Sequence, residues 1–89
     1  MYYVYILKCC DSTLYTGITT DLQKRLATHN SGKGAKYTRS RLPVELAYQE
    51  QQPDKSSALK REIEIKKLTR AQKLQLISQQ INEKHPPEP

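Results

Sequence analysis

The chain has no phenylalanine and no tryptophan, so six tyrosines are the only aromatic side chains among its 89 residues. A hydrophobic core must then rely on leucine, isoleucine and valine, and we expect the tyrosines at its margins. The sequence also lacks a long apolar run, which argues against a signal peptide and against a membrane span. We therefore expect a cytoplasmic protein with no membrane contact. Its length suits one domain, over residues 1–82, with a flexible tail over residues 83–89.

Cysteine is nearly absent, because Cys9 and Cys10 are the only two. Adjacent cysteines rarely bridge each other, since the geometry of a disulfide is hard to meet between neighbours. Two cysteines without histidines nearby also do not make a zinc site. We expect both to be reduced thiols, as is usual in the cytosol.

Acidic residues are in the minority, with 9 Asp and Glu against 15 Lys and Arg, which gives a net charge of +6. Such a balance favours polyanionic partners. Nucleic acid is the first candidate, and an anionic membrane surface is the second. The alternative is a basic protein whose charge only keeps it soluble.

Strand-like and helix-like segments alternate along the chain. Residues 2–8 are rich in aromatic and β-branched residues, and a short turn separates them from a similar segment over residues 13–19, which predicts an antiparallel hairpin. Thr20 to Gln23 fit a capping box, and they indicate a helix that ends near residues 30–32. The remaining segments are expected to be a glycine- and base-rich loop, a third strand and two helices, over residues 32–42, 43–49, 53–68 and 69–82 in turn.

Helical periodicity makes Glu62 the most informative single residue. At about 100° per residue, Glu62 lies inside the apolar arc of its helix rather than opposite it. That arc is formed by Ala58, Leu59, Ile63, Ile65 and Leu68. A carboxylate among core-facing residues costs free energy unless it meets a cation, a metal ion or hydrogen-bond donors. A metal ligand and an ion pair with an arginine or lysine both remain open.

The hairpin and the first helix carry further candidates. Registers centred on the turn place Tyr5 opposite or diagonal to Tyr15, so their side chains can meet on one face. Arg25 and His29 share a face of the helix. That face lies at the margin of the packed side, where a cleft can open. The alternative is a solvated arginine and a hydrogen-bonded histidine without a functional role. Gly17 interrupts a β-rich segment, which indicates either a bulge or a close approach that a substrate can use.

The loop over residues 32–42 combines glycines, cations and one aromatic residue. Its cations are Lys33, Lys36, Arg39 and Arg41. Exposed backbone amides and cations suit phosphates, and Tyr37 can stack on a base. A solvated basic loop without function is the alternative.

Several of these candidates occur together, in a recognisable order. Residues 4–6 (VYI) and residues 15–17 (YTG) resemble the paired GIY and YIG motifs. Arg25 follows in the next helix with His29 one turn later, and Glu62 follows in the segment ALKREIEIKK. In this order and spacing the chain resembles the GIY-YIG nuclease domain, and most of all its small stand-alone bacterial members.

The resemblance covers residue 2 to about residue 70. It implies an α+β fold, a three-stranded antiparallel sheet flanked by helices, and hydrolysis of a nucleic acid with one Mg²⁺ or Mn²⁺ ion. DNA is favoured as the substrate, but the choice between DNA and RNA stays open. It assigns catalytic roles to the two motif tyrosines, the arginine, the histidine and the metal-binding carboxylate, which are Tyr5, Tyr15, Arg25, His29 and Glu62. A tyrosine base has an ordinary pKa of about 10, and we expect Arg25, the metal ion and a nearby lysine to favour its phenolate. Which tyrosine acts as the base stays open.

Two departures from the family pattern leave alternatives open. Both motifs are incomplete, although they keep the tyrosines and Gly17, and the asparagine that many active members carry downstream is matched only by Asn82. A nucleic-acid-binding module with little or no activity is therefore the alternative function. A third hypothesis is an accessory domain whose last helix docks on a protein partner through Leu74, Leu76, Ile77 and Ile81, although the packing of these residues in the core is the favoured alternative. The sequence does not indicate the oligomeric state.

Overall fold

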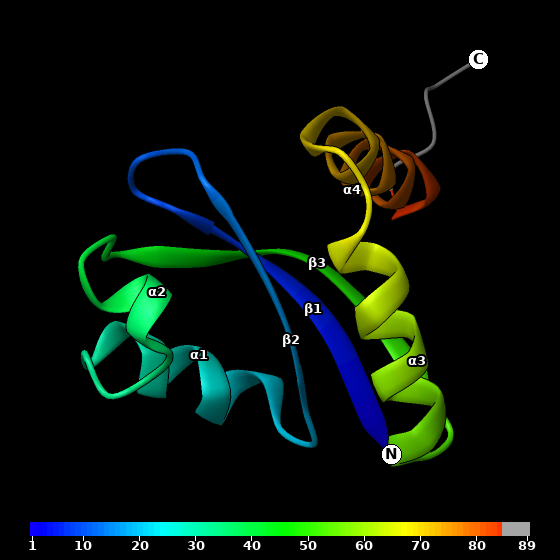
Figure 1. Ribbon diagram of the computed structural model, residues 1–89, viewed down its shortest axis with the longest axis horizontal. Helices are drawn as coiled ribbons and strands as arrows, with labels where there is room; N and C mark the ends of the chain where they lie inside the picture. The colour runs from blue at the N-terminus through cyan, green and yellow to red at the C-terminus, as the bar shows by residue number, and fades with distance from the viewer. Residues whose placement is uncertain (85–89) are drawn as a thin grey trace.

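The computed structural model of the chain describes residues 1–84. Its centre is an antiparallel sheet of three strands, β1 (Tyr2–Cys9), β2 (Leu14–Thr19) and β3 (Val44–Gln52), in the order β2-β1-β3. Figure 1 shows β1 between its two neighbours, with helices on both sides of the sheet. The expected three-stranded antiparallel sheet flanked by helices is confirmed, although β3 runs beyond its predicted end at residue 49.

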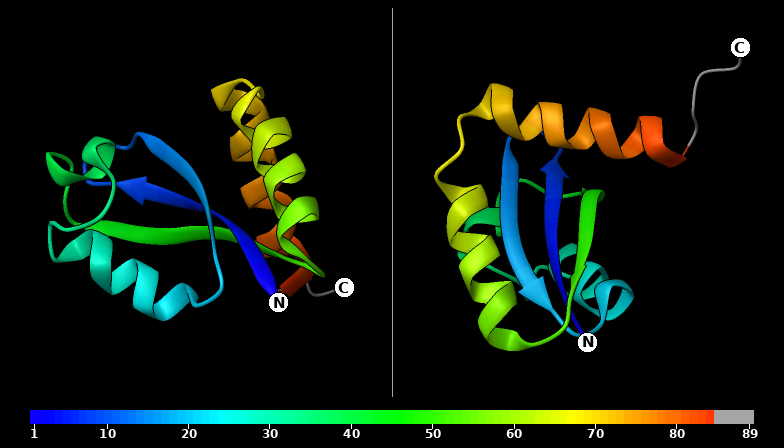
Figure 2. Two further views of the ribbon diagram at one scale, coloured as in Figure 1. Left: turned by 60° about the horizontal axis from the view of Figure 1, so that its bottom comes forward. Right: turned by 90° about the vertical axis from the view of Figure 1, so that its right-hand side faces the viewer.

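The helices are α1 (Leu22–Asn30), α2 (Lys36–Arg39), α3 (Lys55–Lys66) and α4 (Arg70–Lys84). Figure 2 shows α1 and α3 on opposite faces of the sheet and α4 lying across its end. The short helix α2 interrupts the segment that the sequence suggested was only a loop. The α4 helix continues two residues beyond the predicted domain end, and residues 85–89 of the expected tail lie outside the described residues.

The alternating side chains of the strands divide the core into two layers. One layer faces α3 and α4 and contains Val4, Ile6, Tyr48, Ala58 and Ile65. The other faces α1 and contains Tyr5, Leu7, Cys9 and Val44. Tyr5 and Tyr48 are therefore core residues, so the prediction that tyrosines lie at the margins was wrong for these two. Since β1 is covered on both faces, every side chain from Val4 to Leu7 is buried, whatever its type.

One expectation about α1 was wrong, and one alternative for β2 is excluded. The N-terminal cap of α1 is Asp21 rather than the predicted Thr20, because the Asp21 carboxylate accepts a hydrogen bond from the Lys24 amide at 3.1 Å. Of the two alternatives for Gly17, the bulge is excluded, because β2 pairs with β1 in unbroken register, and the one irregularity of the sheet lies between β1 and β3. The C-terminal prediction holds, since Gly32 has a φ of 81° and donates its amide to the His29 carbonyl.

The buried face of α3 differs from the predicted apolar arc. Ala58 and Ile65 are fully buried, whereas Leu59 and Ile63 are 40% and 52% exposed. Arg61 turns toward the sheet because its Nε lies 2.6 Å from the Glu50 carboxylate on β3. The side of α3 that faces the sheet therefore carries this ion pair together with Ala58 and Ile65, instead of the full apolar arc.

The predicted docking face of the last helix is partly used by the protein itself. Leu76 and Ile77 pack against the core, while Leu74 is 41% exposed. The side chains of Ile81 and Asn82 lie outside the described residues. Among residues 1–84, no helix is long and apolar enough to span a bilayer.

Both cysteines are free, but their exposure differs, since Cys9 is buried in the sheet and Cys10 is exposed in the following turn. We therefore expect a thiol-alkylating reagent to modify Cys10 rapidly in the native protein and Cys9 only after unfolding. Mass spectrometry of timed native reactions, with a denatured sample as the control, measures both rates. Two fast native reactions would contradict the burial of Cys9.

Candidate functional site

Tyr5 and Tyr15 lie diagonally on the face of the sheet that α1 covers. The register pairs Tyr5 with Gly17 and Leu7 with Tyr15, which agrees with the predicted arrangement. The Tyr5 phenol lies against the backbone of Gly17, where an added Cβ would stand 2.5 Å from the hydroxyl oxygen and 2.7 Å from Cζ. Gly17 thus provides the close approach that the sequence suggested, with a side chain of the same sheet as the neighbour.

A chain of hydrogen bonds with a fixed direction runs from α1 to α2. The Thr38 hydroxyl donates its only proton to the Ala35 carbonyl at 2.9 Å, so it must accept one from His29 Nδ1, also at 2.9 Å. His29 then carries its proton on Nδ1, and Nε2 accepts from the Tyr5 hydroxyl at 3.1 Å. Arg25 Nε donates to the same Tyr5 oxygen at 3.3 Å. The histidine is consequently oriented to receive a proton from Tyr5.

Burial governs the protonation of both groups. Burial, reinforced by the positive charge of Arg25, lowers the pKa of His29 below its ordinary value of 6.5. Burial also raises the pKa of Tyr5 above 10.0, although Arg25 acts in the opposite direction. The expected effect of Arg25 is confirmed in direction, since its charge favours the phenolate, but desolvation outweighs it. The expected effect of a metal ion stays a prediction.

His29 lies deeper than the sequence suggested. It is fully buried instead of lying at the margin of α1, while Arg25 is half-buried. An added Cβ on Gly34 would stand 2.4 Å from His29 Nδ1, so this glycine leaves room for the ring. The contacts of Gly34 and Thr38 with His29 were not predicted from the sequence. The only signal for them was a glycine and a hydroxyl residue in the loop that follows the candidate histidine.

The aromatic rings continue from the histidine toward the surface. Tyr15 packs edgewise on His29 with ring centroids 5.4 Å apart, and it stacks on Tyr37 at 5.9 Å. The Arg41 guanidinium lies 4.1 Å from the centre of the Tyr37 ring. Tyr37, which is 39% exposed, therefore connects the candidate catalytic residues with the solvent.

The cations of the loop are not equivalent. Arg41 is held in place, since it lies 3.1 Å from the Asp11 carboxylate and donates to the Tyr37 carbonyl at 2.7 Å. Its predicted role as a free phosphate-binding group is thus weakened by these internal contacts. The other three cations of the loop are exposed, and they are Lys33, Lys36 and Arg39.

Glu62 lies on α3, and its negative charge is one of the groups that raise the pKa of Tyr5. Its side chain is 16% exposed, and among the described side chains it forms an ion pair with Lys66 at 3.7 Å, where the lysine is 52% exposed. The predicted ion pair with a lysine is thus present in a weak form, and the metal-ligand role of Glu62 stays a prediction.

The surroundings of Glu62 suit a magnesium ion better than a metal ion that needs several protein ligands. Nowhere in the part of the chain that the structure describes do three or more His, Cys, Asp or Glu side chains gather as a ligand set. Mg²⁺ commonly binds to a single carboxylate and completes its shell with waters and substrate phosphates. Glu62, a half-buried glutamate whose charge acts on Tyr5, suits that mode of binding.

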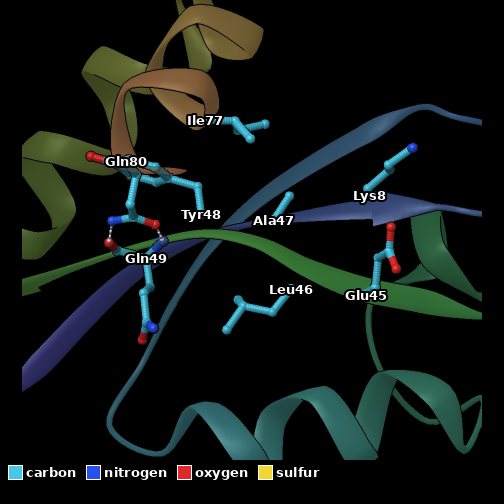
Figure 3. Close-up of a pocket in the computed structure, with 8 residues that line it drawn as sticks. All are labelled: Lys8, Glu45, Leu46, Ala47, Tyr48, Gln49, Ile77 and Gln80. Atoms are coloured by element: carbon cyan, nitrogen blue, oxygen red, sulfur yellow. Dashed lines mark hydrogen bonds between the residues drawn. The ribbon is translucent and has the colours of Figure 1, made fainter. Parts of the chain in front are cut away.

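A hollow of about 470 Å³ lies away from these residues, between β3 and α4. Figure 3 shows Gln80 of α4 reaching the backbone of Gln49, to which its amide bonds in both directions. Asn30 of α1 binds the Val44 backbone in the same way. Two side-chain amides thus occupy backbone groups of β3, an edge strand whose free groups would otherwise invite another strand.

Replacing Gly17 by alanine tests the contact between this glycine and Tyr5. The added methyl group must displace the Tyr5 ring, because 2.5 Å to its oxygen is below any real van der Waals contact. We expect a loss of about 1–3 kcal/mol in the free energy of unfolding, as for other overpacked sites. Urea unfolding measures this loss, and a variant as stable as the wild type would contradict the close approach.

Comparison with known proteins places this arrangement in a family. A family model described as the GIY-YIG catalytic domain matches residues 1–75. A UPF0213 protein from Syntrophus aciditrophicus is 62% identical over 78 residues, which cover 86% of this chain and 90% of that protein. A UPF0213 protein from Staphylococcus haemolyticus is 58% identical over 78 residues, with 88% and 95% covered.

Two solved structures are similar as well. The solution structure of a UPF0213 protein from Bacillus halodurans has 51% identity and a TM-score of 0.56, and covers 88% of this chain and 84% of its own. A solution structure from E. faecalis has 42% identity and a TM-score of 0.63, with 99% and 94% covered. With the family model spanning most of its length, the chain belongs to the GIY-YIG family, whose domains are of nuclease type.

Proposed function

We propose that the protein is a metal-dependent nuclease that hydrolyses phosphodiester bonds, in DNA more than in RNA. The observation that carries this proposal is the directed hydrogen-bond chain from Arg25 through Tyr5 to His29. A purely structural tyrosine does not need a neutral, buried histidine oriented to take its proton. Glu62 contributes a carboxylate to the same site.

Tyr5 is the better candidate for the general base, because its hydroxyl bonds to His29. As the attacking water gives its proton to the Tyr5 oxygen, the Tyr5 proton moves to His29 Nε2. The tyrosine then stays neutral overall, so its raised pKa is no obstacle, and the site needs no standing phenolate. Burial keeps His29 neutral, so Nε2 has a lone pair free to take this proton, although the same burial makes the charged imidazolium costly.

Arg25 and Glu62 have complementary roles in this proposal. The Arg25 guanidinium interacts with both tyrosines, which places a fixed positive charge where the phosphate gains negative charge. Glu62 would hold one Mg²⁺ or Mn²⁺ ion, which when bound supplies Lewis-acid stabilisation of the phosphate.

A nucleic-acid-binding module without activity is the second candidate. It is favoured by the exposed Lys33, Lys36 and Arg39 beside Tyr37, which can bind a strand even if the catalytic groups do not react.

A cleavage assay on single-stranded, duplex, flapped and branched DNA and RNA separates the two functions. We expect products with Mg²⁺ or Mn²⁺ and none with a chelator. Binding to these substrates without any cleavage would favour the binding module over the nuclease.

The loop contributes a separate, salt-dependent prediction. The Lys36→Ala, Arg39→Ala variant should flatten the dependence of log affinity on log salt by about 0.7–0.9 for each phosphate that the protein no longer binds. Lys55→Ala with Lys60→Ala, two exposed lysines of α3, removes the same charge elsewhere and serves as the control. Equal slopes for the two double variants would remove the loop from the interface.

A further inference from the structure

A small hollow of about 180 Å³ lies between the hairpin and α4, and none of the proposed catalytic residues lines it. Its lining comes from three parts of the chain: the start of β2, α2 and the first turns of α4. The residues are Thr13, Leu14, Tyr37, Arg70 and Lys73. Figure 2 shows the start of α4 lying over the end of the sheet where β2 begins.

The two cations of this hollow are available to a ligand. Neither Arg70 nor Lys73 forms an ion pair with any carboxylate among the side chains that the structure describes, over residues 1–80. The helix end itself is already satisfied, because Thr69 and Gln72 exchange side-chain to backbone hydrogen bonds at 3.2 and 2.9 Å. Among the described side chains, no ion pair therefore explains the place of Arg70 and Lys73 beside an aromatic ring.

Tyr37 joins this hollow to the catalytic residues. It lines the hollow on one side and stacks on Tyr15 at 5.9 Å. On the other side of the site a hollow of about 210 Å³ is lined by Lys24 and Arg25. Asp21 also lines that second hollow, but its carboxylate caps α1. A row of contacting side chains, from Arg25 through the two tyrosines and His29 to Tyr37, lies between the two hollows.

We propose that the hollow formed by Tyr37, Arg70 and Lys73 binds a backbone phosphate of the nucleic-acid strand, next to the bond that is cleaved. A strand carries a charge every ~3.4 Å along its axis, so one or two nucleotides span the distance from Tyr15 past Tyr37. Arg70 and Lys73 hold the phosphate, and the exposed ring of Tyr37 offers a surface on which a base or sugar packs. This inference rests on the proposed function, since it assumes that the substrate lies across the two tyrosines.

Binding in the absence of metal tests the inference separately from catalysis. We expect Arg70→Gln with Lys73→Gln to flatten the log-affinity against log-salt slope for single-stranded DNA in chelator, by about 0.7–0.9 for each phosphate released. Lys55→Gln with Lys60→Gln removes the same charge from exposed positions of α3 and should leave the slope unchanged. Thermal unfolding of both variants controls for the fold.

NMR titration of the wild-type protein with the same DNA locates the site directly. The amides of Arg70, Lys73 and Thr13 should shift, and a mononucleotide at equal phosphate concentration should shift them far less. Equal shifts from the mononucleotide would indicate a simple phosphate site and overturn the proposal, as would equal slopes for the two double variants. Binding and shifts as expected without cleavage by the wild type would instead contradict only the nuclease activity.

Discussion

Glu62→Gln is expected to reduce metal-dependent cleavage at least ~10²-fold, the scale that corresponds to about 2.7 kcal/mol of lost transition-state stabilisation. The substitution keeps the shape of the side chain and its hydrogen-bonding capacity but removes the charge that would hold a metal ion. Binding to nucleic acid in chelator should persist, because the exposed cations of the loop and of α4 are unchanged.

The stability of this variant separates the metal-ligand role from a structural ion pair. A fully buried partner left without its counter-ion would cost about 3–5 kcal/mol. Lys66, however, is half exposed and 3.7 Å away, so its ammonium remains in contact with water when the carboxylate is removed. We therefore expect a melting temperature close to that of the wild type.

Glu64→Gln is the matched control, since Glu64 lies on the same helix, is 65% exposed and contacts only Arg61 in an ion pair. Its cleavage rate should stay near that of the wild type. A Glu62→Gln variant that melts early yet cleaves normally per folded molecule would exclude the metal-ligand role.

The parts of this site that the sequence could predict are those that depend on local spacing. The diagonal of Tyr5 and Tyr15 follows from the short hairpin, and the shared face of Arg25 and His29 follows from helical periodicity. The position of Glu62 toward the protein was also predicted, but partly for the wrong reason. Leu59 and Ile63 are exposed, whereas Arg61 forms an ion pair with Glu50 on β3, a contact that no periodicity reveals.

The parts that could not be predicted depend on segments far apart in the chain. Thr38 fixes the proton of His29 only because α2 folds back against α1, and a helix of 4 residues is too short to have a periodic signal in the sequence. Arg70 and Lys73 approach Tyr37 only because α4 crosses the end of the sheet. Burial of His29, and with it the direction of its pKa shift, likewise required the packed structure.

Tyr5→Phe should cost both stability and activity, whereas Tyr15→Phe should cost much less of either. Removing the Tyr5 hydroxyl leaves the buried Nε2 of His29 without its donor, which costs about 1–3 kcal/mol in the free energy of unfolding. It also removes the proposed base, so cleavage should fall by ~10²–10⁴-fold. Phenylalanine at position 15 keeps the ring contacts with His29 and Tyr37, and we expect a loss below about tenfold.

The pH dependence of cleavage tests why Tyr5 matters. If Tyr5 passes its proton to His29, activity requires neutral His29 and is lost when the imidazole is protonated. Because burial and Arg25 lower the pKa of His29, the acid limb of the cleavage profile should lie below pH 6.5. Stability should follow the same direction: the unfolded state takes up the His29 proton first, so unfolding becomes easier as the pH falls below 6.5. Rates measured across this range for wild type and Tyr15→Phe, with urea unfolding alongside, decide the matter. An acid limb above pH 6.5 would contradict the proposed roles of Tyr5 as base and His29 as proton acceptor. A Tyr15→Phe variant as inactive as Tyr5→Phe would contradict them as well.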